Sequence, residues 1–172
     1  MGDNGKVTWA KLIWARSNIP RHAFISWVFI QHRLPTKMRL NKYLPQREIT
    51  CTICNTVAED ETHLFFECNY AKDIWKELSR WWQHLPIAQN SQNLMNAMLK
   101  SSGAKTKKHI ICAITSAAIY LLWRARNQAI FNKQVISAKQ TVYLIKEQVR
   151  HKILYLNTIS SKYKMYIDSI LH

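Results

Sequence analysis

Apolar residues recur at helical spacing through most of the second half of the chain. Between His109 and about Phe131 the apolar positions 110, 114, 117, 118, 121 and 122 form one face, and residues 139 to 156 repeat the scheme at positions 142, 145, 149, 153 and 156. Residues three and four positions apart lie on the same side of an α-helix. The pattern therefore predicts two long helices, each with one side turned toward a core.

The first half of the chain has shorter apolar stretches between helix-breaking residues. The spacing predicts a first helix that Thr8 can cap and that ends near Ser17, and a second, largely buried helix with Pro20 at its first position. Pro35 ends the second helix, since a residue before proline avoids the helical region. Thr36 can then cap a short third helix that ends before the next proline.

Two more helices are predicted in the middle of the chain. Apolar residues recur from position 70 to position 82, and a modest helix is expected at 94–99, between loops near Pro86 and at 100–108. The tryptophans lie on apolar helical stripes, so we expect them in the core and not on a base-stacking surface. They are Trp9, Trp14, Trp27, Trp75, Trp81, Trp82 and Trp123.

Three of the four cysteines and one histidine lie within residues 51–68. The spacing C-x2-C-x8-H-x4-C offers three thiols and one imidazole, from Cys51, Cys54, His63 and Cys68, which is the ligand number of a closed tetrahedral zinc site. One alternative is that the four are unrelated residues of a type that is often buried, with His63 an ordinary core imidazole; a disulfide framework is another. The combined spacing favours Zn²⁺ over both, and Cys112, far away on an apolar helix face, is interpreted as core.

The separation of His63 and Cys68 is awkward for one ideal helix, because positions five apart do not share a face. We therefore expect either that the helix proper begins near Cys68 or that the intervening LFFE forms a distorted turn. The few glycines and prolines favour long regular elements. The predicted fold class is mainly α, a helical domain with a small CCHC zinc knuckle or hairpin between helices.

The net charge of +15 predicts attraction to polyanions, among which nucleic acid and acidic membrane surfaces compete. Residues 51–77 carry two lysines against six carboxylates, so the cysteine region is the acidic part of a basic chain. We expect the flanking helices to contact phosphate, although each basic residue is equally well explained as part of a solvated face. The candidate nucleic-acid contacts are Arg21, Arg33, Lys37, Arg39, Lys42, Arg47, Lys105, Lys107, Lys108, Arg124 and Arg126.

The residues that catalysis would need are scarce. A catalytic zinc site keeps an open coordination position, whereas four protein ligands are present here. Glu61 and Glu67 are nearby carboxylates, but acidic residues around a zinc finger are more often solvated loop. Outside residues 51–77 the carboxylates are Asp3, Glu48, Glu147 and Asp168, and none forms a paired metal-binding motif. The sequence thus predicts a binding module and not an enzyme. Without a membrane-spanning apolar run or a secretory signal, we expect an intracellular protein, in the nucleus or elsewhere, with no membrane partner.

Several motifs resemble one known family. IPRHAFISWVFIQHRLPTKMRL, followed by the Cys3His set with ETHLFFEC and AKDIW, is similar to the zinc-binding region after the reverse transcriptase domain of plant LINE-type (non-LTR) retrotransposons. The resemblance covers about residues 7–83, and RLPT and HLFFEC occur in the family's order. LLWRARNQAIF also resembles a W-x-x-R-N-x-x-x-F segment found downstream in many of these elements, here Trp123, Arg126, Asn127 and Phe131.

The resemblance implies that Cys51, Cys54, His63 and Cys68 bind zinc in an accessory domain. It also implies a role in holding template RNA or target DNA beside a polymerase, with nucleic acid and the element's reverse transcriptase domain, in cis or in trans, as partners. The polymerase, endonuclease and RNase H regions of such elements are absent, which suggests a separate reading frame or a remnant of a decayed element.

The sequence thus predicts a zinc-binding domain at 7–83 and a basic helical extension at 90–172. The predicted function is a non-catalytic, zinc-stabilised nucleic-acid-binding accessory domain of a retrotransposon reverse transcriptase. Two alternatives stay open: a structural zinc module for protein–protein contacts, and a degenerate fragment without selected function. The sequence does not distinguish RNA from DNA as the ligand, and it does not place the two basic clusters on one face.

Overall fold

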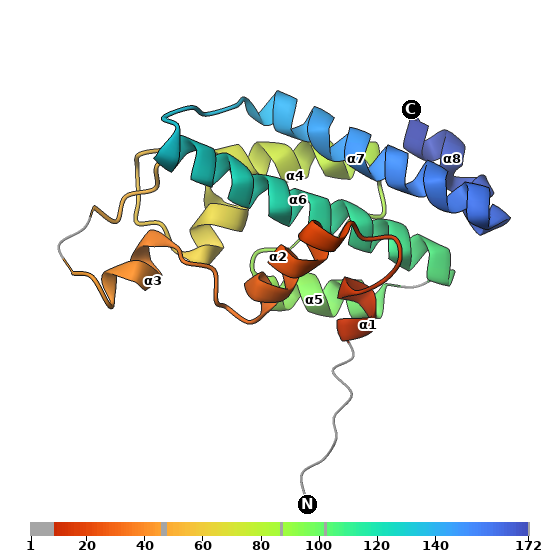
Figure 1. The fold of residues 1–172 in the computed structure, drawn as a ribbon, viewed down its shortest axis with the longest axis horizontal. Coiled ribbons are helices and arrows are strands. Elements are labelled where there is room, and N and C mark those ends of the chain that lie inside the picture. Colours follow the sequence, from red (N-terminus) through yellow and green to blue (C-terminus); the bar gives the residue numbers. More distant parts are fainter. Residues whose placement is uncertain (1–8, 46–47, 87, 102, 172) are drawn as a thin grey trace, which may run out of the picture.

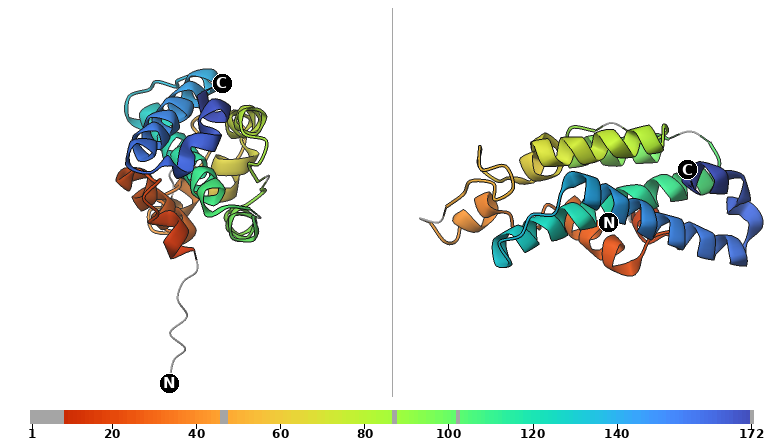
Figure 2. Two further views of the ribbon diagram at one scale, coloured as in Figure 1. Left: turned by 90° about the vertical axis from the view of Figure 1, so that its right-hand side faces the viewer. Right: turned by 90° about the horizontal axis from the view of Figure 1, so that it is seen from above.

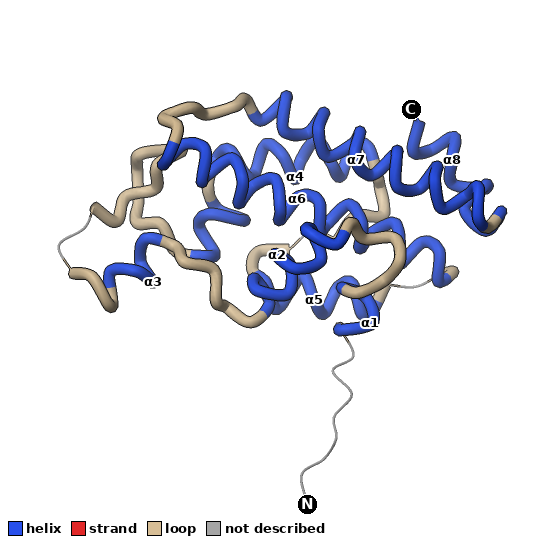
Figure 3. Tube along the Cα trace, in the orientation of Figure 1, coloured by secondary structure: helices blue, strands red, loops and turns tan. Residues whose placement is uncertain are grey.

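The protein is mainly α-helical, as the apolar spacing predicts (Figures 1 and 3). A computed structural model describes residues 9–45, 48–86, 88–101 and 103–171; 69% of the chain is helical, and the described part contains no strand. In chain order the elements are α1 (Ala10–Ile13), α2 (Pro20–Ile30), α3 (Lys37–Asn41), the π-helical turn η1 (His63–Glu67), α4 (Asn69–Trp81), α5 (Ser91–Lys100), α6 (Lys105–Phe131), α7 (Ala138–Ile159), the 3-10 turn η2 (Ser161–Tyr163) and α8 (Lys164–Leu171).

The long helix α6 is the centre of the structure. It packs against α7 and α2 most extensively, and against α1, α5 and η1 as well; the end-on view in Figure 2 shows it among the other helices. The predicted face of α6 is buried, and so are neighbouring positions such as Ile111, Ala113 and Ile119. A helix that is apolar around most of its circumference is covered on several sides. At 27 residues, α6 also spans about 40 Å, most of the length of the molecule.

Helix α7 packs against both α6 and α4. Its predicted apolar positions, including Val142, Ile145 and Val149, are all buried. Helix α4 packs on α7, and the Tyr70 hydroxyl lies 2.6 Å from that of Thr141, within hydrogen-bonding distance across the two helices. The hydrophobic core therefore includes buried residues from both predicted parts of the chain. The division into 7–83 and 90–172 stays a prediction about sequence organisation.

Three local predictions differ from the structure. The first helix is shorter than expected, because the Asn18 side-chain amide donates to the carbonyl oxygens of Leu12 and Ile13 at 3.1 and 2.7 Å and so satisfies the last turn of α1. Residues 105–108 belong to α6 and not to a loop. Trp14 is 55% exposed and is not core. The predicted cap Thr8 lies outside the described residues.

The remaining helix predictions are close to the observed elements. Helix α2 begins with Pro20 in its first turn, and the Thr36 side chain accepts from the backbone N–H of Arg39 at the start of α3. Phe24 is exposed, so one side of α2 faces solvent. Among the helices that the structure describes, none combines the length and the apolar character that crossing a bilayer needs.

Candidate metal centre

The first two cysteines lie on a tight turn that a small antiparallel pairing closes. Thr50 and Ala58 form an isolated antiparallel bridge, and the Cys51 N–H donates to the Val57 carbonyl at 2.8 Å. The Asn55 N–H donates back to the Cys51 carbonyl at 2.8 Å, and Asn55 itself has a φ of 54°. Asparagine accepts this left-handed conformation more readily than most residues. The turn thereby brings the Cys54 sulfur back beside Cys51.

The other two candidate ligands lie at the two ends of η1. The backbone N–H of Cys68 donates to the carbonyl of His63 at 2.7 Å, a bond from residue i+5 to residue i that defines a π-helical turn. The Asp60 carboxylate accepts from the His63 N–H at 2.7 Å and caps the start of this turn. The wider turn places residues five apart on one side. This confirms the expectation that LFFE is distorted, and α4 begins directly after Cys68.

The four side chains converge on one point. The sulfurs of Cys51, Cys54 and Cys68 and a ring nitrogen of His63 all lie within 4.8 Å of one another. The Cys54 Sγ to His63 Nε2 distance is 3.3 Å. A zinc ion with ordinary bond lengths separates tetrahedral sulfur ligands by roughly 3.8 Å. The cluster therefore has the donor set and nearly the spacing of a closed Cys3His zinc site, and every donor except the Cys54 sulfur belongs to a buried residue.

The thiols are also prepared for a cation. The neighbouring Cys68 thiol, together with the backbone N–H groups of Cys54 and Ile53, outweighs burial and lowers the pKa of Cys51 to about 4. The pKa of Cys68 is raised, first by the neighbouring Cys51 sulfur and then by burial. For His63, burial lowers the pKa, but hydrogen bonds to Cys51 and Cys54 outweigh it and raise the pKa overall. Zinc binding replaces such shared protons with a metal ion.

A buried ion pair joins the metal loop to α6, and the sequence did not predict it. Glu59 is 0% exposed and Arg126 is 4% exposed. The Arg126 guanidinium donates to the Glu59 carboxylate through Nη2 at 2.7 Å and through Nε at 3.0 and 3.2 Å, and it also donates to the Pro35 carbonyl at 3.2 Å. The acidic segment AEDE, residues 58–61, therefore contains a fixed carboxylate.

Glu59 also organises α3. Its carboxylate accepts from the backbone N–H of Lys37 at 3.0 Å, and its backbone carbonyl accepts from the N–H of Met38 at 3.0 Å. Both donors belong to the first turn of α3, whose N–H groups have no partners within the helix. The segment between the second cysteine and the histidine thus holds α3 on one side and α6 on the other. The sequence feature that could have indicated this contact is Arg126 in the W-x-x-R-N-x-x-x-F segment, although the motif does not indicate which residue pairs with it.

The two other carboxylates that were considered near the site have different surroundings. Glu61 lies 2.7 Å from the His32 imidazole, and its pKa is raised because burial outweighs the His32 contact. Glu67 is exposed at the end of η1. Glu61 is thus engaged in a local pair that joins His32, two residues after α2, to the metal loop.

The candidate basic residues fall into two separate groups. Arg33, Arg39 and Lys42 are exposed on or next to α3, whereas Lys105 and its neighbours lie at the beginning of α6. Figure 1 shows these two regions at opposite ends of the molecule. Helix α6 separates basic residues widely as well: Lys107 near its start and Arg124 near its end are about 25 Å apart along the helix axis. The prediction that Arg126 contacts nucleic acid is wrong, because its guanidinium pairs with Glu59 and does not face solvent.

The remaining candidates differ in their surroundings. The Lys37 ammonium group donates to the Thr50 carbonyl at 2.6 Å, and Arg21 lies over the Tyr120 ring with a hydrogen bond to Gln148. Arg124 is exposed, and Arg47 lies outside the described residues.

The comparison with family models agrees with the geometry of the cluster. Residues 1–75 match the family described as zinc-binding in reverse transcriptase. The matched region contains all four residues of the Cys3His cluster and ends within α4. This family is a zinc-binding accessory domain and not a catalytic one, and together with the cluster it supports Zn²⁺ as the cofactor. No curated protein and no solved structure matches the chain.

Proposed function

We propose that the protein is a non-catalytic, zinc-stabilised accessory domain that binds RNA or DNA for a reverse transcriptase of a LINE-type retrotransposon. Cys51, Cys54, His63 and Cys68 hold the zinc ion, which fixes the loop before α4. The observation that carries the proposal is the group of exposed basic residues Arg33, Arg39 and Lys42, which we name the α3 basic cluster. It lies beside the metal loop in a chain of net charge +15.

The support for this cluster is that its backbone is anchored to the metal loop. Helix α3 is hydrogen-bonded to Glu59 at its first turn, and Glu59 lies between the two pairs of metal ligands in the sequence. A bound metal would therefore hold the cluster in one orientation, and a charged surface binds a polyanion more tightly when it is ordered in advance. Because Lys105, Lys107 and Lys108 lie at the far end of α6, they would serve as a second, separate contact with a long nucleic acid.

Salt dependence of binding tests this function. Affinity for a fluorescent oligonucleotide should fall as salt rises, because phosphate contacts release counterions, with a logarithmic slope of about −0.7 per contact for a single strand. Three substitutions that each remove a positive charge, Arg33→Gln, Arg39→Gln and Lys42→Gln, should together reduce the magnitude of the total slope by about 2. The matched control replaces the exposed Lys139, Lys162 and Lys164 by glutamine. No binding by the wild-type chain at low salt, or equal loss in both triple variants, would refute the proposal.

A protein-interaction module is the second candidate, and one observation favours it. Large apolar side chains are exposed on α7 and α8, among them Tyr143, Tyr155, Ile159 and Met165. Such residues are typical of contact surfaces when they are contiguous. Salt-insensitive binding of a reverse transcriptase domain, without binding of an oligonucleotide, would favour this function instead.

A further inference from the structure

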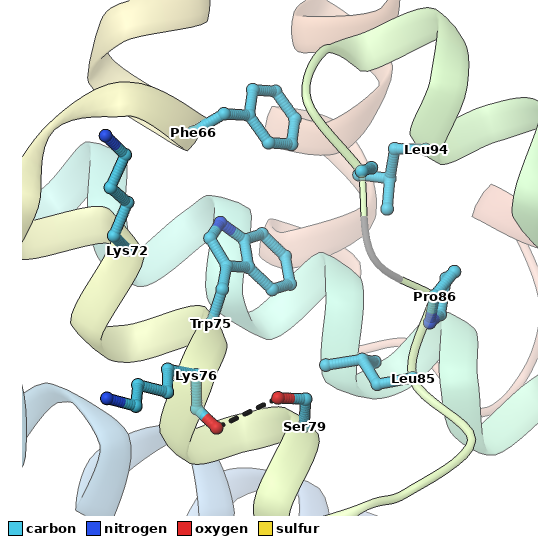
Figure 4. A pocket seen from close by; sticks show the side chains of 9 residues that line it. Phe66, Lys72, Trp75, Lys76, Ser79, Leu85, Pro86 and Leu94 are labelled. Atoms are coloured by element: carbon cyan, nitrogen blue, oxygen red, sulfur yellow. Dashed lines mark hydrogen bonds between the residues drawn. The ribbon is translucent and has the colours of Figure 1, made fainter.

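A cavity of about 320 Å³ lies beside the candidate metal centre, between η1, α4 and the segment that leads into α5. Its walls include Phe66 and Trp75 on one side and Leu85, Pro86 and Leu94 on the other. Figure 4 shows the Trp75 indole projecting from α4 into the space between Phe66 on one side and Leu85, Pro86 and Leu94 on the other. This volume is at the lower end of the range for small-molecule sites. It therefore suits one flat ring better than an extended ligand.

The aromatic wall of this cavity is rigid. The rings of Phe66 and Trp75 are nearly parallel, with an interplanar angle of 6° and centroids 6.3 Å apart. The Trp75 Nε1–H donates to the Phe65 carbonyl at 2.7 Å, which fixes the orientation of the indole. Trp75 is nevertheless only half-buried, although the apolar spacing predicted it in the core. Part of a large, fixed aromatic surface is therefore open to a ligand without the cost of ordering the side chain first.

Two lysines give the cavity a positive edge. Lys72 and Lys76 are exposed and follow each other at i, i+4 on α4, so they lie on the same side of the helix. The acidic residues Asp73 and Glu77 of the same helix line a different cavity, where they lie with Lys139 and Lys146 of α7. The two lysines are thus not offset at the mouth of the first cavity by these carboxylates, although residues 51–77 are acidic as a whole.

We propose that this cavity, the base pocket, takes one unpaired base of a single-stranded nucleic acid. The base stacks against the exposed part of Trp75, and an adjoining phosphate lies near the ammonium groups of Lys72 and Lys76. Stacking on an aromatic side chain does not depend on which base is present, whereas paired bases inside a duplex do not reach such a cavity. This inference rests on the proposed nucleic-acid-binding function and adds a preference for single strands.

The position of Phe66 connects the base pocket to the metal centre. Phe66 lies in η1, between His63 and Cys68, so one wall of the pocket is formed by the turn that the metal ion would close. Removal of the metal should therefore widen or collapse the pocket. Loss of the metal ion is expected to weaken single-strand binding more than the loss of the ion's positive charge alone explains.

The test compares single strands with duplexes in two variants. Ser79→Leu fills the pocket from a half-buried lining position on α4 and retains helix propensity. It should weaken binding of a single-stranded uridine or thymidine oligonucleotide about tenfold and leave duplex binding unchanged. Lys72→Gln with Lys76→Gln should weaken single-strand binding more than the charge-matched control, Lys162→Gln with Lys164→Gln.

Photocrosslinking locates the bound base without any substitution. An oligonucleotide that contains 5-iodouridine or its deoxy form should crosslink to Trp75 or Phe66, and mass spectrometry of the digested complex identifies the residue. Binding that is unchanged in Ser79→Leu, with crosslinks outside the pocket, overturns the base pocket and leaves the proposed function intact. Failure of the wild-type chain to bind any oligonucleotide overturns both. Circular dichroism of each variant establishes that the helices are retained.

Discussion

Replacement of Arg126 by methionine should destabilise the protein strongly and loosen the metal loop. Arg126→Met keeps an unbranched apolar side chain in α6 but removes the guanidinium that faces Glu59. The carboxylate of Glu59 then stays fully buried, with the backbone N–H of Lys37 as its remaining described donor. The Pro35 carbonyl loses its hydrogen bond from Arg126 as well. The change therefore leaves an uncompensated charge inside the fold.

The size of the effect follows from this geometry. Removal of one partner from a buried ion pair costs about 3–5 kcal/mol, because the other charge loses its compensation without regaining water. We expect the free energy of unfolding to fall by about 4 kcal/mol, near the middle of that range. A domain of this size has a total stability of roughly 5–15 kcal/mol. The loss is therefore a large part of the total stability. Glu59→Leu combined with Arg126→Met should recover most of it, since both charges are then absent.

Urea denaturation of the zinc-loaded protein measures this effect, and competition with a chromogenic chelator reports metal affinity. Metal affinity should fall together with stability, because Glu59 lies between Ala58, which pairs with Thr50, and Asp60, which caps the turn of His63. The matched control is Arg124→Met, two positions away on the same helix but exposed, which should change stability by less than about 0.5 kcal/mol. Equal stability of Arg126→Met and wild type would refute the role of the pair.

Three further predictions address the metal, the pH dependence and a helix cap. Cys54→Ser should abolish retention of a bound zinc ion in native mass spectrometry, whereas Cys112→Ala, a buried cysteine outside the cluster, should retain it. His22 is buried, and burial together with Arg21 lowers its pKa to about 4. The unfolded state therefore binds more protons below pH 6.5, and the free energy of unfolding falls by roughly 3 kcal/mol as the pH drops from 7 to 4. His22→Phe should remove that part of the pH dependence in denaturation curves. Ser137→Ala should cost about 1 kcal/mol in thermal unfolding, because the Ser137 hydroxyl accepts from the Gln140 N–H at the start of α7; no change would mean that water replaces the cap.

The features that sequence spacing predicted are those that depend on local geometry. The apolar periods located α6 and α7 because a buried face repeats with the helix itself. The Cys3His cluster was predicted for the same reason, as its spacings reflect one tight turn and one widened helical turn. Even the distortion of LFFE was predictable, since two ligands five positions apart cannot share a face of an ideal α-helix.

Features that join distant segments were not predictable in this way. Glu59 and Arg126 are separated by 67 positions, and neither the acidic loop nor the basic helix indicates which charge is buried. Trp14 was expected in the core because it lies on an apolar stripe, but α1 ends before it, and the side chain is 55% exposed. Charge counts placed the positive residues in blocks along the chain. Because α6 is long, the basic residues at its start lie far from those on α3.

The Cys3His cluster fixes much more of the molecule than its small loop suggests. The π-helical turn closes the cluster through Cys68, and α4 begins at the next residue, so the direction of α4 follows from the metal centre. From the other side of the loop, Glu59 holds α3 and Arg126 of α6. The proposed phosphate contacts on α3 and the proposed base pocket on α4 are therefore joined through the same few residues. Loss of zinc should disturb both surfaces together, whereas a substitution in either surface should leave the other intact.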